Sequence, residues 1–256
     1  MRARLAGACI WGTHGPSRLF PSQAHTGDVD MLRDRDDAGG RLTWLLSPLV
    51  TQGSGTEAVV LALPRGGVPV GAAIARGLGL PLDVCVVRKL GAPGNPEYGF
   101  GAIGEGGVRV VDEDSMRALQ LDEADVAAVE ERERARLDDA VARYRAVRAR
   151  VPLAGRTAIV VDDGIATGGT ARAAARVARA AGATRVIVAA GVAAPDSLHA
   201  LMRDGSADLA LAALIPNRLM AVGQWYLDFS QTPDSEVLRL LAEAGSAPAV
   251  GDGEDA

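Results

Sequence analysis

A short segment in the second half of the chain joins two carboxylates to a turn built of small residues. Residues 159–170 read Ile-Val-Val-Asp-Asp-Gly-Ile-Ala-Thr-Gly-Gly-Thr. Ionised carboxylates are pure hydrogen-bond acceptors, so Asp162 and Asp163 are suited to bind sugar hydroxyl groups. The turn after them is rich in backbone N–H groups, and Gly168 and Gly169 let its backbone approach a phosphate closely. We therefore predict a sugar-phosphate site at the N-terminus of a helix that begins near Gly169.

The same residues also fit a purely structural turn. Asp-Asp-Gly is common turn chemistry, and Thr167 or Thr170 could cap the next helix. The β-branched run 159–161 before the carboxylates and the Ala/Arg-rich run 171–181 after the turn predict strand, loop and helix in that order. This is the context that a phosphate-binding turn requires. The predicted phosphate contacts are Ala166, Thr167, Gly168, Gly169 and Thr170.

Two further segments carry basic side chains where predicted strands end. Pro64-Arg65-Gly66-Gly67 directly follows an apolar run and fits either an ordinary strand-to-helix turn or a second anion-binding turn. Lys89 is the single lysine among the 27 basic Lys and Arg residues, and it follows Arg88. The lysine at position 89 either stands there by chance in an arginine-rich composition or indicates that this position needs an amine.

Together these segments resemble the type I phosphoribosyltransferases. Residues 159–170 are similar to the ribose-phosphate signature of that family, residues 64–67 to its pyrophosphate loop, and the pair Arg88-Lys89 to the pair that opens the mobile loop of adenine and orotate enzymes. A wider stretch, about 31–243, is similar to an uncharacterised bacterial group of phosphoribosyltransferase-like proteins.

The resemblance implies a role for each segment. Asp162 and Asp163 would bind ribose, residues 166–170 its 5′-phosphate, and Arg88 and Lys89 would act in catalysis. The implied pyrophosphate contacts are Arg65, Gly66, Gly67, Arg88 and Lys89. The family's pyrophosphate loop typically holds a non-proline cis peptide. One departure is that this chain lacks the further lysine that those enzymes carry a few residues on, so less positive charge is available to the leaving group.

The sequence says less about the acceptor of the phosphoribosyl group. In hypoxanthine-guanine enzymes the position that matches Ala166 holds an aspartate that contacts the purine. This chain lacks that carboxylate, which argues against a 6-oxopurine as the acceptor. Trp225 and Tyr226, in a short aromatic cluster, could stack on a planar acceptor or could simply close the edge of the sheet. Glu97 and Glu105 are candidates for a catalytic base.

The rest of the sequence predicts the elements that position these residues. Short apolar runs predict strands at 58–63, 84–87, 159–161, 186–189 and 209–214. Helical patterns occupy 31–50, 70–77, 113–150, 169–181 and 196–202. This alternation predicts an α/β fold with a parallel sheet flanked by helices. Ligands of such sheets bind beyond the carboxyl ends of the strands, where residues 64, 88 and 162 are expected.

Two segments between these elements have distinct compositions. Residues 90–107 are rich in glycine and hold two prolines, which predicts a flexible loop leading into a hairpin through 102–103 and 108–111. The cluster 130–134 reads Glu-Glu-Arg-Glu-Arg and is typical of a solvated helix face with i,i+4 ion pairs.

We expect one domain with appendages. The predicted parts are a disordered leader at 1–28, a phosphoribosyltransferase-like domain at 29–243 with a helical insertion at 113–150 and a small hood or edge at 215–243, and a disordered tail at 244–256. A chain of 256 residues with 48% hydrophobic content can bury a full core.

Composition narrows the class of protein. The net charge of −5 argues against binding to nucleic acids through phosphate contacts. Two cysteines and three scattered histidines give no disulfide framework and no zinc-ligand spacing. No apolar run reaches the roughly 18 residues of a membrane span, and we expect a cytoplasmic protein.

The resemblance implies phosphoribosyl transfer from 5-phosphoribosyl 1-diphosphate to a nitrogen acceptor, in nucleotide metabolism. Mg²⁺ would bind through ligand oxygens and water, with no direct protein ligand. The expected partners are small molecules, not nucleic acids or membranes, and a homodimer is a further expectation. A regulatory protein that binds the same sugar diphosphate, or a hydrolase that cleaves it, are the alternatives. The acceptor's identity and the catalytic base stay open.

Overall fold

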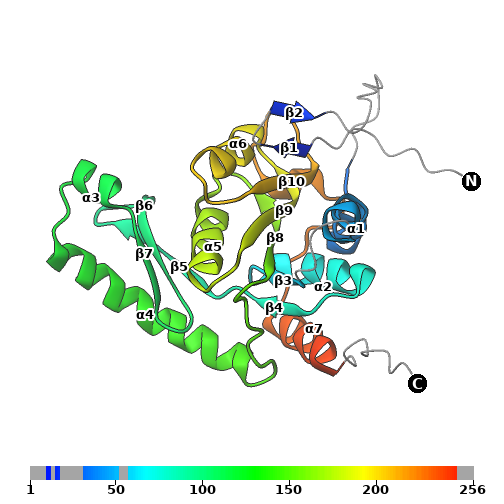
Figure 1. Ribbon diagram of the computed structural model, residues 1–256, viewed down its shortest axis with the longest axis horizontal. Helices are drawn as coiled ribbons and strands as arrows, with labels where there is room; N and C mark the ends of the chain where they lie inside the picture. The colour runs from blue at the N-terminus through cyan, green and yellow to red at the C-terminus, as the bar shows by residue number, and fades with distance from the viewer. Residues whose placement is uncertain (1–9, 13–14, 18–30, 52–56, 247–256) are drawn as a thin grey trace, which may run out of the picture.

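The computed structural model describes residues 10–12, 15–17, 31–51 and 57–246. Its centre is a sheet of five parallel strands flanked by helices, as the sequence predicts (Figure 1). In spatial order these strands are β10 (Leu209–Leu214), β9 (Arg185–Ala193), β8 (Thr157–Ile165), β3 (Ala58–Ala62) and β4 (Leu82–Val84). The helices around it are α1 (Arg35–Thr51), α2 (Gly67–Leu78), α5 (Gly169–Ala180), α6 (Pro195–Arg203) and α7 (Asp234–Ser246).

Successive residues of the central strands are buried on opposite faces. Val60 and Ile159 lie in one apolar cluster with residues of α1, α2 and α7, whereas Leu61 and Val160 lie in a second cluster with residues of α5 and α6. A strand covered on both faces needs apolar residues at every position. This explains why the apolar runs that predict β3, β8 and β10 are continuous rather than alternating.

The sheet continues beyond β10 into the predicted disordered leader. Within residues 1–28, β1 (Ile10–Gly12) pairs antiparallel with β10 through Trp11 and Ala210, and β2 (Gly15–Ser17) pairs with β1. The expected disordered leader includes these two short strands, and β1 pairs with backbone groups that β10 would otherwise expose at the edge of the sheet. The other residues of 1–28 lie outside the described part of the chain.

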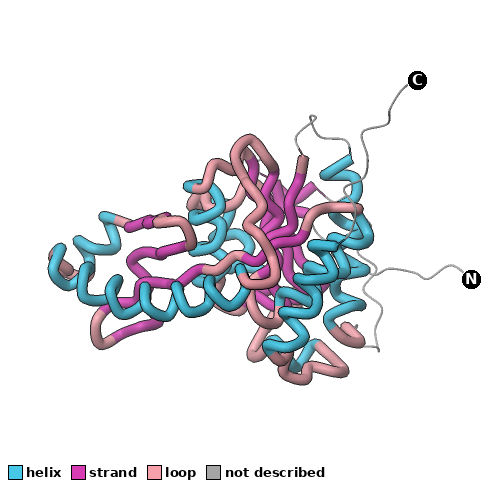
Figure 2. Tube along the Cα trace, turned by 90° about the horizontal axis from the view of Figure 1, so that it is seen from below, coloured by secondary structure: helices cyan, strands magenta, loops and turns pink. Residues whose placement is uncertain are grey.

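A second unit projects from the core as an arm (Figures 1 and 2). It holds an antiparallel sheet of three strands and two helices. These are β5 (Val87–Ala92), β6 (Asn95–Gly104), β7 (Val108–Val111), α3 (Glu113–Ala118) and α4 (Glu123–Arg145). Both α4 and the core helix α5 contact strands β5 and β6. The predicted helix over 113–150 is therefore two helices.

The predicted flexible loop at 90–107 is mostly sheet. The expected hairpin is present, with Ala102 opposite Val110, but β5 and β6 are paired as well. The glycines permit close packing here: a Cβ on Gly104 would overlap the side chain of Val177 of α5, and one on Gly101 would lie 2.6 Å from the carbonyl oxygen of Val110. Glycine in a strand often marks such a close approach, and composition alone does not separate this use from flexibility.

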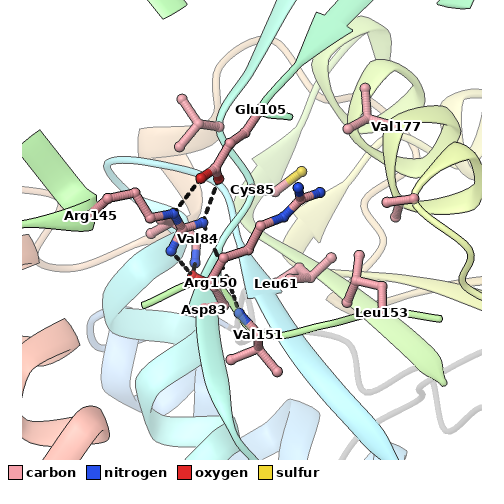
Figure 3. A pocket seen from close by; sticks show the side chains of 13 residues that line it. Leu61, Asp83, Val84, Cys85, Glu105, Arg145, Arg150, Val151, Leu153 and Val177 are labelled. Carbon is pink, nitrogen blue, oxygen red and sulfur yellow. Dashed lines mark hydrogen bonds and ion pairs between the residues drawn. The ribbon is translucent and has the colours of Figure 1, made fainter. Parts of the chain in front are cut away.

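An ion cluster joins the arm to the core (Figure 3). Arg145, at the end of α4, donates to Asp83 of β4 at 2.6 Å and to Glu105 of the β6–β7 turn at 2.6 and 2.7 Å. Asp83 is 1% exposed and also accepts from the backbone N–H of Val151, where the chain returns to the core. One guanidinium therefore ties together the outgoing strand, the returning segment and a turn of the arm.

The C-terminal segment closes over the start of α1. The 3₁₀ helix η1 (Val222–Trp225) leads into Tyr226, which forms a parallel bridge with Leu32, and α7 follows. Helix α7 continues to Ser246, within the predicted tail at 244–256, and residues 247–256 lie outside the described part. In the described residues, no helix combines the length and apolar character needed to cross a membrane.

Candidate functional site

The two predicted ribose carboxylates lie near the carboxyl end of β8, in the middle of the sheet. The backbone N–H of Asp163 donates to Oδ1 of Asp162 at 2.9 Å. Burial raises the pKa of Asp162 well above its usual range, and the neighbouring charge of Asp163 raises it further. The ionised form of Asp162 would therefore be stabilised by a ligand that donates hydrogen bonds, such as a sugar hydroxyl, or by a cation.

The predicted phosphate turn, residues 166–170, joins β8 to α5 without a side-chain cap. Gly168 is the N-cap residue, with φ 77° in the left-handed region, and neither Thr167 nor Thr170 caps the helix as the structural alternative required. The first N–H groups of α5 are therefore not satisfied by a capping side chain. Ser197 of α6 donates to the carbonyl oxygen of Ala166 at 2.6 Å and holds the outer side of the turn.

The predicted pyrophosphate loop packs directly on the carboxylate strand. A Cβ on Gly67 would lie 2.5 Å from the carbonyl oxygen of Val161 and 3.0 Å from Cα of Asp162, and one on Gly66 would overlap the carboxylate of Asp163. Glycine is required at both positions for this approach. The Pro64–Arg65 peptide bond is cis, the feature that the family resemblance implies.

Lys89 and Arg88 point to different sides of the arm sheet. Cδ and Nζ of Lys89 lie 3.6 and 3.9 Å from where a Cβ of Gly169 would be. A cavity of about 130 Å³ is lined in part by Lys89, by Thr167 of the turn, and by Gly169 and Arg172 of α5. Arg88 donates to the carbonyl oxygen of Arg136 on α4, at 3.4 Å. Successive strand residues face opposite ways, so only Lys89 lies beside the phosphate turn.

The three basic residues of the implied pyrophosphate set do not form one cluster. Arg88 and Lys89 were expected at the end of a central strand, but they belong to β5 of the arm, because β4 ends at Val84. The half-exposed guanidinium of Arg65 lies 3.7 Å from Asp234 at the start of α7. The backbone of residues 66–67, rather than a cluster of cations, is what the structure brings to the carboxylates.

Arg35 is a residue of the site that sequence reasoning missed. From the first turn of α1 its Nε and Nη2 atoms contact Oδ2 of Asp163 at 2.9 and 2.8 Å, across 128 positions of sequence. It stands in the charged cluster of residues 33–37, which looks like an ordinary solvated helix start. An arginine within such a cluster gives no local signal of a partner so far along the chain.

Of the two predicted acceptor aromatics, Tyr226 contacts the carboxylate segment. Tyr226 is 4% exposed, and its hydroxyl donates to the backbone carbonyl of Asp163 at 2.6 Å. Burial raises its pKa, which keeps this donor protonated at neutral pH. Trp225 is partly buried against the core cluster. Tyr226 is therefore buried against the central strands β8 and β9, not at the edge of the sheet, and its role toward an acceptor stays a prediction.

Two other expectations concern the base and the metal. Glu105 is bound to Arg145 in the joint between arm and core, and the side chain of Glu97 lies outside the described residues. Among the described residues, no group of three or more histidine, cysteine, aspartate or glutamate side chains is arranged to hold a metal ion. Binding of Mg²⁺ through oxygen atoms of the ligand and water, with no direct protein ligand, stays a prediction.

This chain is similar to known proteins over most of its length. A curated Mycobacterium tuberculosis protein, provisionally named a phosphoribosyl transferase, is 48% identical over 231 residues, which cover 88% of this chain and 51% of that protein. This chain therefore spans about half the length of that relative. A solved Thermus thermophilus protein is 41% identical, with a TM-score of 0.77 over 84% of this chain and 100% of that one. The family model of the phosphoribosyl transferase domain matches residues 30–201, and the chain belongs to this family of transferases.

Proposed function

We propose that this protein transfers the phosphoribosyl group of 5-phosphoribosyl 1-diphosphate to a nitrogen atom of a nucleobase-like ring and releases pyrophosphate. The observation that carries the proposal is the packing of Gly66 and Gly67 on Val161–Asp163, beside the uncapped N-terminus of α5. Three kinds of recognition, for a diphosphate, a ribose and a 5′-phosphate, thereby meet at one end of the sheet.

Each group would act on a different part of the sugar diphosphate. The backbone of residues 66–67 would bind the diphosphate, Asp162 the ribose hydroxyls, and residues 166–170 the 5′-phosphate through N–H groups and the helix dipole. Lys89 lies beside that turn, so we assign its ammonium group to the 5′-phosphate side of the ligand in place of the pyrophosphate.

The reaction breaks the bond between the anomeric carbon and the diphosphate oxygen and forms one between that carbon and the acceptor nitrogen. Positive charge develops on the ribose as pyrophosphate leaves, and the carboxylates beside the ribose would stabilise it. The acceptor nitrogen then loses its proton to solvent. Mg²⁺, when bound, would neutralise the charge that grows on the departing diphosphate.

The test follows pyrophosphate release. The protein is incubated with 5-phosphoribosyl 1-diphosphate, Mg²⁺ and a panel of purine and pyrimidine bases. Release that depends on one base supports the transferase, release without any base indicates a hydrolase, and binding without release indicates a regulatory protein. The variant Asp162→Asn with Asp163→Asn should lose affinity for the sugar diphosphate, and unchanged affinity would refute the ribose assignment.

The protein's setting is part of the same proposal. We infer a small-molecule enzyme of nucleotide metabolism that acts in the cytoplasm, without nucleic acid or membrane partners. A homodimer stays a prediction, and sedimentation of the purified chain tests it.

A further inference from the structure

Arg35 makes more contacts in the site than an ordinary ion pair requires. Besides Asp163, its Nη1 atom donates to the carbonyl oxygen of Ser230 at 2.7 Å, and its guanidinium carbon lies 4.3 Å from the centre of the Phe229 ring. The side chains of Arg35 and Asp163 are only 13% and 15% exposed. A planar guanidinium held on three sides is a fixed group rather than a solvated surface charge.

The atom that Arg35 binds is also the atom that faces the pyrophosphate loop. Both guanidinium contacts go to Oδ2 of Asp163, and a Cβ on Gly66 would overlap that same oxygen. Tyr226 holds the backbone carbonyl of Asp163 from the other side. Asp163 is therefore fixed between α1, the loop and the C-terminal segment, which limits its freedom to turn toward a sugar.

From this geometry we propose that Arg35 is a positioning residue of the sugar-diphosphate site. It fixes Asp163 under the pyrophosphate loop and leaves Asp162 as the carboxylate that binds the ribose. The inference rests on the proposed function and deepens it, because it assigns ribose binding to Asp162 alone, whereas the signature sequence assigns it to both carboxylates.

Charge adds a second consequence. The groups that face the pair are Arg35 from α1 and the Tyr226 hydroxyl from the C-terminal segment, and Asp37 of α1 acts on that hydroxyl. Among them only Arg35 is cationic, and its charge lowers the pKa of Asp162, against burial and against the charge of Asp163, which both raise it. Without Arg35 the pKa of Asp162 rises further, so the ionised form that accepts ribose hydroxyls appears only at higher pH.

The experiment compares Arg35→Met, Arg35→Lys and the control Arg33→Met. Arg33 lies two positions away with a 75% exposed side chain. Carboxyl ¹³C NMR of the unliganded protein follows the titration of Asp162, and calorimetry measures the affinity for 5-phosphoribosyl 1-diphosphate with Mg²⁺ between pH 5.5 and 8.5. We expect Arg35→Met to move the Asp162 midpoint to higher pH and to weaken binding roughly 10- to 100-fold at pH 7, with partial recovery as the pH rises.

The controls separate positioning from plain structural support. Arg35→Lys keeps the charge and should restore the Asp162 midpoint and part of the affinity, while Arg33→Met should match the wild-type protein. An unchanged midpoint in Arg35→Met, or a loss of affinity that is equal at every pH, overturns the proposed role. Failure of the wild-type protein to release pyrophosphate would refute the proposed function instead, and the NMR titration would still decide the role of Arg35.

Discussion

Replacing Arg145 by methionine should destabilise the protein and loosen its arm. The substitution keeps much of the side-chain volume but leaves Asp83 and Glu105 without their shared cation. The side chains of Asp83 and Glu105 are 2% and 16% exposed, so neither carboxylate can recover full hydration. Removing one partner of a buried ion pair typically costs about 3–5 kcal/mol.

The lower end of that range applies here. Asp83 keeps two backbone donors, from Val84 at 2.7 Å and Val151 at 2.9 Å, which still stabilise its charge. We expect a loss of about 3 kcal/mol in the free energy of unfolding, which corresponds to a fall in Tm of roughly 6–12 °C for a chain of this size. Urea denaturation gives the free energy, and hydrogen exchange of β5 and β6 reports whether the arm opens before the core.

Two further variants show whether the lost ion cluster causes the effect. Arg132→Met removes a 59% exposed arginine from the same helix and should cost less than about 0.5 kcal/mol. Adding Asp83→Asn to Arg145→Met removes the charge of a carboxylate that has lost its cation, and should recover part of the lost free energy of unfolding. If Arg145→Met cost no more than Arg132→Met, the cluster would be an ordinary surface contact and the reasoning would fail.

Two other predictions follow from the packing. Gly66→Ala should weaken binding of 5-phosphoribosyl 1-diphosphate at least tenfold, as measured by calorimetry, because the added Cβ needs the space of the Asp163 carboxylate. The control Gly40→Ala should bind as the wild-type chain does, because its added Cβ would meet nothing within 4 Å. Burial raises the pKa of Cys85 to about 12. Its thiolate fraction at pH 8 is then about 10⁻⁴, so iodoacetamide should label it, by peptide mass spectrometry, at least about 1000-fold faster in urea. Equal rates would contradict its burial.

Local sequence signals were sufficient for four of the five parallel strands of the central sheet, β3, β8, β9 and β10. The apolar run at 209–214 coincides with β10, and the helix expected at 169–181 is α5, at Gly169–Ala180. Buried parallel strands need continuous apolar runs, and such runs are visible without any knowledge of the partner strand. The turn before α5 could also be predicted, from the glycines and small residues between the apolar run and the helix.

The arm could not be predicted in the same way. Residues 84–87 read Val-Cys-Val-Val, an unbroken apolar run with no turn residue, yet β4 ends at Val84 and β5 of another sheet begins at Val87. The change of sheet is set by tertiary contacts with α4 and α5, which leave no mark in this run. That change moves Arg88 to the α4 side and leaves Lys89 beside the phosphate turn.

Asp162 should improve ligand binding at the expense of stability. Its folded pKa is raised, so between its ordinary pKa and the raised value the folded chain binds more protons than the unfolded chain, and stability falls as the pH rises through that window. Above the raised pKa the whole penalty is present. Asp162→Asn should therefore raise Tm at pH 8 and lose that advantage below about pH 4, where the carboxyl is protonated in both states.

The same variant should lose affinity for the sugar diphosphate, because an amide accepts sugar hydroxyls more weakly than a carboxylate does. Thermal scans of Asp162→Asn and wild-type protein across pH, beside calorimetry with the ligand, measure both effects. A lower Tm for the variant at pH 8 would mean that Asp162 is a structural residue whose charge the fold needs. A higher Tm with lost binding would mean that the fold tolerates an unfavourable charge at the position where a ligand can use it.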